Sequence, residues 1–250
     1  AASPELIREA GLHADRLSVN IEIPSEPNLK MLAPEKDYKS ILTPMNSIHQ
    51  GILVSKEDSR KFRSAPKFVP AGQSTQLIVG ATPDTDRQIL TLASGLYNHQ
   101  SLKRVYYSGY IPINKSDSRL PALTAPPLVR ENRLYQSDWL MRFYFFRVDE
   151  IVNDPHQNLD LDIDPKLSYA IRNPWMFPVD INKAPFELIL RVPGIGVKSA
   201  KLILTSRRYG RISSYQLQKM GVVMKRAKYF ITCNELASPT INEIKPENMK

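Results

Sequence analysis

The chain has 250 residues, enough for two domains, and its 34 lysine and arginine residues exceed its 25 acidic residues, giving a formal net charge of +9 at pH 7. The single cysteine, Cys233, excludes an internal disulfide and suits a reducing cytoplasm, so we expect a cytoplasmic location. No apolar run approaches the roughly 18 residues that a membrane-spanning helix needs, so we expect no membrane partner.

The first 120 residues have the pattern of an α/β domain. Residues 3–5, Ser-Pro-Glu, form a helix start signal. Helical spacing predicts a further helix at 85–97, and apolar, β-branched stretches predict strands at 17–23, 76–80 and 104–111. Helices that alternate with apolar strands predict βαβ units and a parallel sheet.

A connector is expected over residues 121–178. Prolines make residues 112–130 an extended linker, and the aromatic helix that follows places Trp139, Phe143 and Phe146 on one face, where core packing is the expected use. The alternating carboxylates of residues 160–164 suggest calcium. However, no glycine stands where a calcium loop turns and no bidentate glutamate follows, so we interpret this stretch as a solvated connector.

An apolar helix end meets a basic amphipathic helix at a Val-Pro-Gly-Ile-Gly turn. Glycine reaches positive φ without steric cost, so Gly194 and Gly196 allow a tight turn while Ile195 points into the core. The amides around Ile195 and Gly196 then face outward at a helix N-terminus, which favours an anion such as a phosphate. Lys198 and Lys201 lie on the first turns of this helix. A glycine-rich turn with two solvated lysines is the alternative interpretation.

Basic residues gather around this turn. Residues 188–234 contain ten basic residues and no acidic residue, which leaves about −1 of net charge for the rest of the chain. A surface of one sign costs self-repulsion, and a polyanionic partner best explains it. Nucleic acid is the leading candidate, and an anionic membrane surface is the alternative.

Helix signals surround the turn and repeat after it. Asn182 is the expected N-cap of the helix before the turn, and Ser213 or Ser214 is expected to cap a third helix. A second turn then places Gly221 where Gly194 stands in the first turn, with Val223 in the position of Gly196. This pattern resembles a tandem helix-hairpin-helix module, the non-sequence-specific DNA-binding unit of many repair proteins. Since Val223 replaces a glycine, we expect the second hairpin to bind asymmetrically or to serve mainly as structural support.

The resemblance implies contacts to DNA phosphates, which position a protein without reading sequence. A helix-hairpin-helix glycosylase is excluded because such enzymes place a catalytic aspartate soon after the turn, and no carboxylate occurs between Glu187 and Glu235. The expected DNA-binding residues are Pro193, Gly194, Ile195, Gly196, Lys198, Ser199, Lys201, Arg207, Arg208, Gly221, Lys225 and Arg226.

Nearly the whole sequence resembles a known family, the DNA modification and repair radical S-adenosylmethionine proteins. The matching stretches are residues 16–25, 68–76, 134–144 and 177–233. The resemblance implies an α/β fold: a partial (β/α) barrel of the radical S-adenosylmethionine type, followed by an all-α tandem helix-hairpin-helix domain. It also implies action beside a protein similar to uracil-DNA glycosylases. The expected divisions are a barrel part at 1–120, a connector at 121–178, the DNA-binding module at 179–236 and a tail at 237–250.

One departure from this family concerns its cofactor. Radical enzymes of this type hold a 4Fe-4S cluster through three cysteines in a CxxxCxxC motif, and S-adenosylmethionine binds the fourth iron. This chain has only Cys233, in its basic segment, so it cannot hold such a cluster. The four histidines are scattered singly, and no metal site is expected. We therefore expect a C-terminal fragment of a longer protein, with no cofactor of its own.

Part of a cofactor pocket is still implied by the resemblance. Asn20 and Glu22 are expected to meet the ribose or amino-acid end of S-adenosylmethionine. Alternatively, Glu22 pairs with Arg16 or Lys30, and residues 73–76 only make a turn. The donors expected for a carboxylate or an adenine edge are Gln73, Ser74, Thr75 and Gln76.

Two functions remain open at this point, and no catalytic residue is assigned. In the first, the parent protein is a radical S-adenosylmethionine enzyme acting on DNA, and this chain supplies its DNA-binding module and half of its cofactor pocket. In the second, the chain is a stand-alone DNA-binding adaptor, without catalysis of its own, that recruits a repair enzyme. A CxxxCxxC motif encoded upstream would favour the first, and a start codon just before Ala1 would exclude it.

Overall fold

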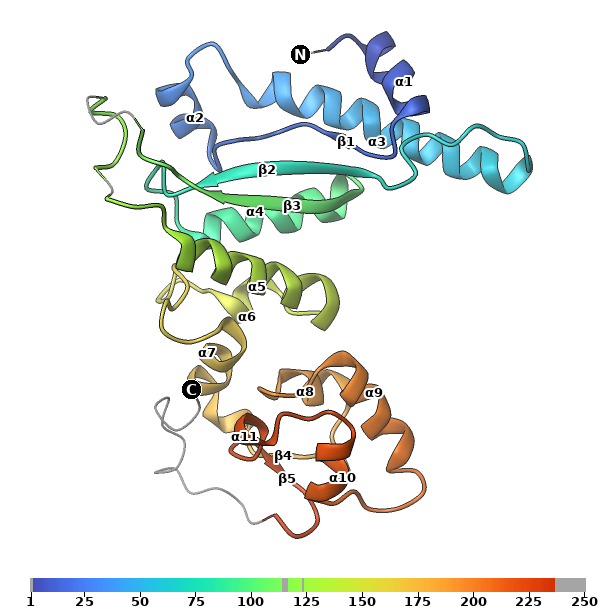
Figure 1. Ribbon diagram of the computed structural model, residues 1–250, viewed down its shortest axis with the longest axis vertical. Coiled ribbons are helices and arrows are strands. Elements are labelled where there is room, and N and C mark those ends of the chain that lie inside the picture. The colour runs from blue at the N-terminus through green and yellow to red at the C-terminus, as the bar shows by residue number, and fades with distance from the viewer. Residues whose placement is uncertain (1, 114–116, 123, 237–250) are drawn as a thin grey trace. The chain divides into compact units, whose positions relative to one another are not determined.

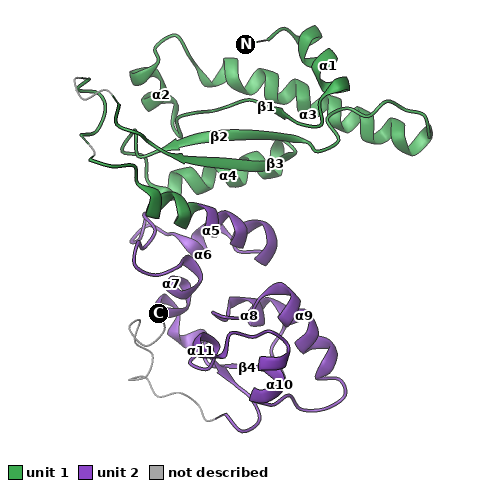
Figure 2. Cartoon of the chain, viewed as in Figure 1, with its two compact units in different colours: residues 1–134 green, residues 135–250 purple. Residues whose placement is uncertain are grey.

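The computed structural model describes residues 2–113, 117–122 and 124–236. The chain forms two compact units, residues 1–134 and residues 135–250, and the boundary falls inside one long helix (Figure 2). The tail predicted for residues 237–250 lies outside the described residues. Among the described helices, none combines the length and the hydropathy that crossing a bilayer requires.

A parallel three-stranded sheet organises the first unit (Figure 1). Its strands, in spatial order, are β1 (Leu17–Ser18), β2 (Gln73–Val79) and β3 (Leu102–Gly109). The register pairs Leu17 with Gln73 at one end and Val79 with Gly109 at the other. The predicted α/β class and parallel sheet are confirmed. The predicted barrel is not: in the described part of the chain the sheet is open, because these three strands do not close on themselves.

Strand β1 is shorter than the predicted 17–23, and within the predicted range Glu22 takes a φ of +68°, in the left-handed region. The chain nevertheless returns to the sheet there, since the Glu22 N–H donates to the Gln76 carbonyl at 3.0 Å. The Ile78 N–H donates back to the Glu22 carbonyl at 2.6 Å. Glu22 therefore lies beside β2 outside any regular strand.

Among the described residues, four helices lie wholly in the first unit: α1 (Pro4–His13), α2 (Glu26–Leu32), α3 (Tyr38–Lys61) and α4 (Asp86–His99). The predicted start of α1 is confirmed, since the Ser3 side chain accepts from the Leu6 N–H. The α4 prediction is confirmed in the same way by Thr85, which forms a capping box with Gln88. The predicted elements do not include α2 and α3. Pro44 lies inside α3, where a proline normally argues against a continuous helix.

The two faces of this sheet differ in polarity. Leu77 and Val105 point to one face and are fully buried, and α3 and α4 contact β2 and β3. Right-handed crossovers between parallel strands in sequential order place both helices on the same face. The alternate positions carry exposed Gln76, half-buried Arg104 and Tyr106, and the Arg104 guanidinium lies 5.5 Å from the Tyr106 ring centroid. In the described chain this second face is polar.

The second unit is mainly helical and contains a small parallel sheet of β4 (Val179–Asp180) with β5 (Ile231–Thr232). Its core joins apolar side chains from most of its elements, among them Leu167, Ile189, Ile195, Ile203 and Phe230. Its helices are α5 (Leu128–Tyr144, which begins in the first unit), α6 (Val148–Ile151), α7 (Pro165–Arg172), the 3-10 helix η1 (Pro174–Met176), α8 (Phe186–Arg191), α9 (Val197–Ser206), α10 (Ser214–Lys219) and α11 (Met224–Ala227).

The segment predicted as a connector contributes to this core and differs from prediction at its aromatic residues. Phe146 is buried, as predicted, and packs edge-on against Tyr169. Trp139 and Phe143 are 50% and 41% exposed, so core packing is wrong for this pair. Their ring centroids lie 4.3 Å apart, so the two rings pack against each other instead.

Candidate nucleic-acid interface

The first hairpin consists of α8, a tight turn and α9. Gly194 has a φ of +87°, and a Cβ placed on it would lie 2.7 Å from the Val223 carbonyl oxygen. Only glycine fits this position, for both its conformation and its space. Ile195 is 1% exposed, so its predicted orientation into the core is confirmed. Gly196 is the N-cap residue of α9 and has a φ of −93°, which any L-residue can adopt.

The second hairpin, α10 and α11 with their turn, has the same geometry. Gly221 has a φ of +82°, the next residue, Val222, is buried, and Val223 is the N-cap residue of α11 with a φ of −78°. Val223 can therefore stand in the position of Gly196, because neither residue uses positive φ, although ψ is 83° at Val223 and 169° at Gly196.

The two hairpins bond to each other through their turns. The Val223 N–H donates to the Gly194 carbonyl at 2.9 Å, and the Ser199 hydroxyl donates to the Met220 carbonyl at 2.9 Å. The Val223 amide is thereby occupied, whereas in the described chain the Gly196 N–H takes no backbone acceptor. The second turn thus uses at Val223 the backbone amide that has no described backbone acceptor at Gly196 in the first turn.

Seven of the ten basic residues in this segment are exposed. Lys198 and Lys201 follow the first turn on α9, which begins with the unpaired amides of a helix N-terminus. The N-cap residue, Gly196, has no side chain to satisfy those amides. The others are Arg208, Arg211, Lys219, Lys225 and Lys228.

The other three basic residues have structural partners. Arg191 is buried and forms two hydrogen bonds to the Glu150 carboxylate, at 2.8 and 2.9 Å. Arg207 donates to the carbonyls of Ile181 and Ala184 at 3.2 and 2.6 Å. A different acid, Asp164, forms a close ion pair with Arg226. Arg207 and Arg226, both expected at DNA, thus also stabilise the module.

Two further expected DNA-binding residues lie inside the module. Pro193 is buried, and Ser199 is 6% exposed with its hydroxyl directed to the second hairpin. Asn182 is not an N-cap, because α8 begins later, with Pro185 as its N-cap residue. The Asn182 side chain instead donates to the Ile212 carbonyl at 3.3 Å and accepts from the Ile212 N–H at 2.8 Å. Ser213 caps α10, as predicted.

Lys166 lies directly beneath the first turn and was not among the predicted site residues. It is 9% exposed, and its ammonium donates to the Ile195 carbonyl at 2.6 Å. The Tyr144 ring centroid lies 4.8 Å from its Nζ. Burial lowers the pKa of Lys166 to about 7; Asp164 opposes this shift, while Arg191 and Arg226 add to it. A Lys-Leu pair early in an amphipathic helix gives no local signal of this contact.

The expected cofactor residues fall into two groups. Gln73 and Thr75 are fully buried; Gln73 donates to the Met45 carbonyl at 3.2 Å, and Thr75 accepts from the Ile21 N–H at 3.1 Å. Ser74 is also buried, and only Gln76 of this strand is exposed. The structure therefore does not bring these four side chains together on one surface.

Asn20 and Glu22 lie at the other strand. Asn20 accepts from the Ser18 hydroxyl at 2.8 Å and helps to line a cavity of about 630 Å³ beside β1. Glu22 pairs with Lys36 at 2.7 Å, and this contact raises the pKa of Lys36. Glu22 thus forms an ion pair, as the alternative expected, but the expected partners are wrong: Arg16 bonds to Tyr106 and Lys30 pairs with Glu26.

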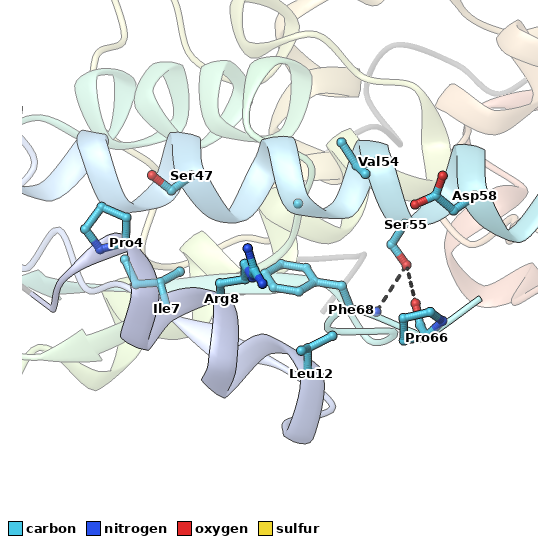
Figure 3. Close-up of a pocket in the computed structure, with 11 residues that line it drawn as sticks. Pro4, Ile7, Arg8, Leu12, Ser47, Val54, Ser55, Asp58, Pro66 and Phe68 are labelled. Carbon is cyan, nitrogen blue, oxygen red and sulfur yellow. Dashed lines mark hydrogen bonds between the residues drawn. The ribbon is translucent and has the colours of Figure 1, made fainter. Parts of the chain in front are cut away.

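A second cavity, of about 490 Å³, lies between α1 and α3 (Figure 3). Phe68 projects into it between the two helices and would contact a Cβ at either Gly11 or Gly51. Arg8 and Asp58 also line it, and its surface is mainly apolar. The Phe68 N–H donates to the Ser55 hydroxyl at 3.1 Å, which fixes the loop that carries the ring.

A buried polar cluster follows the carboxyl end of β2. Thr82 donates to the Asp84 carboxylate at 2.5 Å, and Arg130 donates to the Asp84 carbonyl and the Asp86 carboxylate, both at 2.7 Å. Burial, with the nearby Asp84 carboxylate, raises the pKa of Tyr38. These groups are satisfied by one another and tie α4 to α5.

The residues present do not fit an iron–sulfur cluster. Cys233 is half-buried in the second unit, burial raises the pKa of its thiol, and one thiolate cannot hold three irons. Within the described ranges, no three His, Cys, Asp or Glu side chains are grouped to hold a metal ion. Comparisons of the chain with protein-family models, with curated proteins and with solved structures find no match.

Proposed function

We propose that the second unit binds DNA, without sequence specificity, through two hairpins that act as a tandem helix-hairpin-helix module. The observation that carries this proposal is the Gly196 amide at the start of α9, which has no backbone acceptor within the described residues and lies next to exposed Lys198 and Lys201. Unpaired amides, the positive end of a helix and two ammonium groups together suit one DNA phosphate.

The proposed role of the second hairpin is to support the first hairpin and to add positive charge beside it. Its turn amide at Val223 bonds to Gly194, so it offers that amide to no phosphate. Lys225 is exposed on the short helix that follows and can meet the backbone as a point charge. Backbone contacts of this kind position a protein on DNA without reading its bases.

We further propose that the first unit is part of a radical S-adenosylmethionine barrel. Its three parallel strands in sequential order, with α3 and α4 packed on one face, are features of a (β/α) barrel segment. No radical chemistry is assigned to the chain itself, since its single thiol cannot hold the cluster. A DNA-binding adaptor without catalysis is the second candidate, and the same observation favours it.

The test of DNA binding is fluorescence anisotropy of labelled duplex, single-stranded and gapped DNA titrated with the 250-residue chain. Binding should weaken steeply as salt rises from about 50 to 200 mM, because phosphate contacts release counterions. Affinity should depend little on sequence. Absence of binding at low salt on all three substrates would overturn the proposal.

The matched variants compare two pairs of exposed lysines. Lys198→Ala with Lys201→Ala should lower affinity for every sequence and flatten the salt slope by up to about two charges' worth. Lys56→Ala with Lys61→Ala removes the same charge from α3 in the first unit and should leave the salt slope unchanged. Equal effects of the two pairs would show that net charge, not the hairpin, governs binding.

A further inference from the structure

We propose that Lys166 is a positioning residue for the phosphate contact, because its ammonium holds the Ile195–Gly196 peptide with the N–H directed outward and places positive charge behind it. This inference rests on the proposed DNA-binding function and deepens it. It assigns a role in DNA binding to a buried side chain that would not contact the DNA itself.

The orientation follows from the planarity of the peptide bond. The Ile195 carbonyl and the Gly196 N–H belong to one trans peptide, so they point in opposite directions. The buried Lys166 ammonium donates a hydrogen bond to the Ile195 carbonyl oxygen at 2.6 Å. The Gly196 N–H is therefore directed away from Lys166, and the exposed Lys198 and Lys201 follow it in the first turns of α9. A charge-assisted hydrogen bond to the carbonyl also polarises the N–H at the other end of the peptide.

The groups around Lys166 leave one positive charge uncompensated. Asp164, which caps α7, pairs with Arg226 of α11, and Glu150 of α6 pairs with Arg191 of α8. Tyr144 of α5 contributes only its ring face, 4.8 Å from the Lys166 ammonium. Among the described neighbours three cations thus face two carboxylates. A DNA phosphate on the outer side of the peptide would supply the missing negative charge.

This arrangement links DNA binding to a proton. Burial lowers the pKa of Lys166 to about 7 in the free protein, and a phosphate nearby would raise it. Above about pH 7, binding should therefore take up as much as about one proton, and affinity should fall as pH rises. A lysine with a merely structural role would give no proton uptake.

The experiment measures proton uptake by calorimetry of the full chain binding a short duplex. Titrations at about pH 8 in two buffers of different ionisation enthalpy report the protons bound. We expect uptake with the wild-type chain, none with Lys166→Met, and about tenfold weaker binding for that variant at about pH 6, where wild-type Lys166 is charged. Lys183→Met, at an exposed site, and His156→Gln should both keep the wild-type uptake.

The outcomes separate this inference from the function on which it rests. If the wild-type chain binds DNA with no proton uptake, or if Lys166→Met keeps the wild-type uptake, the positioning role is overturned and DNA binding stands. If the wild-type chain binds no DNA at any pH, the proposed function fails first. The wild-type measurement needs no variant, so the test holds even if Lys166→Met does not fold.

Discussion

Gly194 and Gly196 stand two positions apart in one turn but meet different structural demands. We expect Gly194→Ala to lower the free energy of unfolding by about 1 kcal/mol or more beyond Gly196→Ala, because it forces a side chain into positive φ. It also places a Cβ 2.7 Å from the Val223 carbonyl oxygen, whereas the nearest atom at Gly196 is the Tyr144 hydroxyl at 3.5 Å. Urea unfolding of both variants measures the difference, and equal losses would contradict it.

Arg191 and Arg208 are equally basic in sequence and differ in what they contact. Arg191→Ala should destabilise the second unit by about 3–5 kcal/mol, because it leaves the half-buried Glu150 carboxylate without its bidentate partner. Arg208→Ala, at an exposed position, should change stability by less than about 0.5 kcal/mol. Chemical unfolding checks the pair, and comparable losses would argue against a structural role for Arg191.

At the scale of elements, Asp164 joins the start of α7 to α11. Its carboxylate accepts from the N–H groups of Lys166 and Leu167, both at 3.1 Å, and pairs with Arg226. Asp164→Asn keeps the cap and loses the ion pair, whereas Asp164→Ala loses both. We expect the alanine variant to be less stable than the asparagine variant by about 1 kcal/mol. A thermal unfolding comparison tests this order, and the reverse order would exclude the capping role.

Signals within a few residues, such as helix caps, predicted where helices begin. The side-chain roles that the sequence did not reveal depend on partners far away in the chain. The Ser3, Thr85 and Ser213 caps could be predicted because each cap side chain and the backbone N–H that donates to it lie within three residues. The role of Arg191 was not readable, since its Glu150 partner lies 41 residues away. Arg226 pairs with Asp164 across 62 residues, and a count of basic residues assigned it to DNA. Lys198 and Lys201, assigned to DNA with it, are exposed.

The sheet shows the same limit. Apolar stretches located β2 and β3, but Gln73, Ser74 and Thr75 were expected at a ligand and lie buried. Whether a polar residue in a strand faces solvent or a helix depends on which face the helices cover. That is decided by α3 and α4 together, and α3 was not among the predicted elements.

At the scale of the whole molecule, one buried amine makes stability depend on pH. Unfolded, Lys166 holds its proton up to the ordinary value of 10.5, whereas in the native chain the pKa of Lys166 falls to about 7. Between these values the unfolded chain binds more protons, so the free energy of unfolding should rise with pH. Urea unfolding at about pH 6.5 and about pH 8.5 should show this rise in the wild-type chain and in Lys183→Met, but not in Lys166→Met. An equal rise in Lys166→Met would assign it to other groups.

The shared geometry of the two turns has a consequence for how such repeats diverge. Gly194 and Gly221 both take positive φ, so replacing either by another residue would strain the backbone. Gly196 and Val223 are N-cap residues with negative φ, which other residues adopt without strain. Mutations that accumulate in a duplicated hairpin should therefore erase the second glycine first and leave the fold intact. A sequence search that requires both glycines in each hairpin will overlook second copies such as residues 220–227. A pattern of one glycine, one buried aliphatic residue and a helix start would recover them.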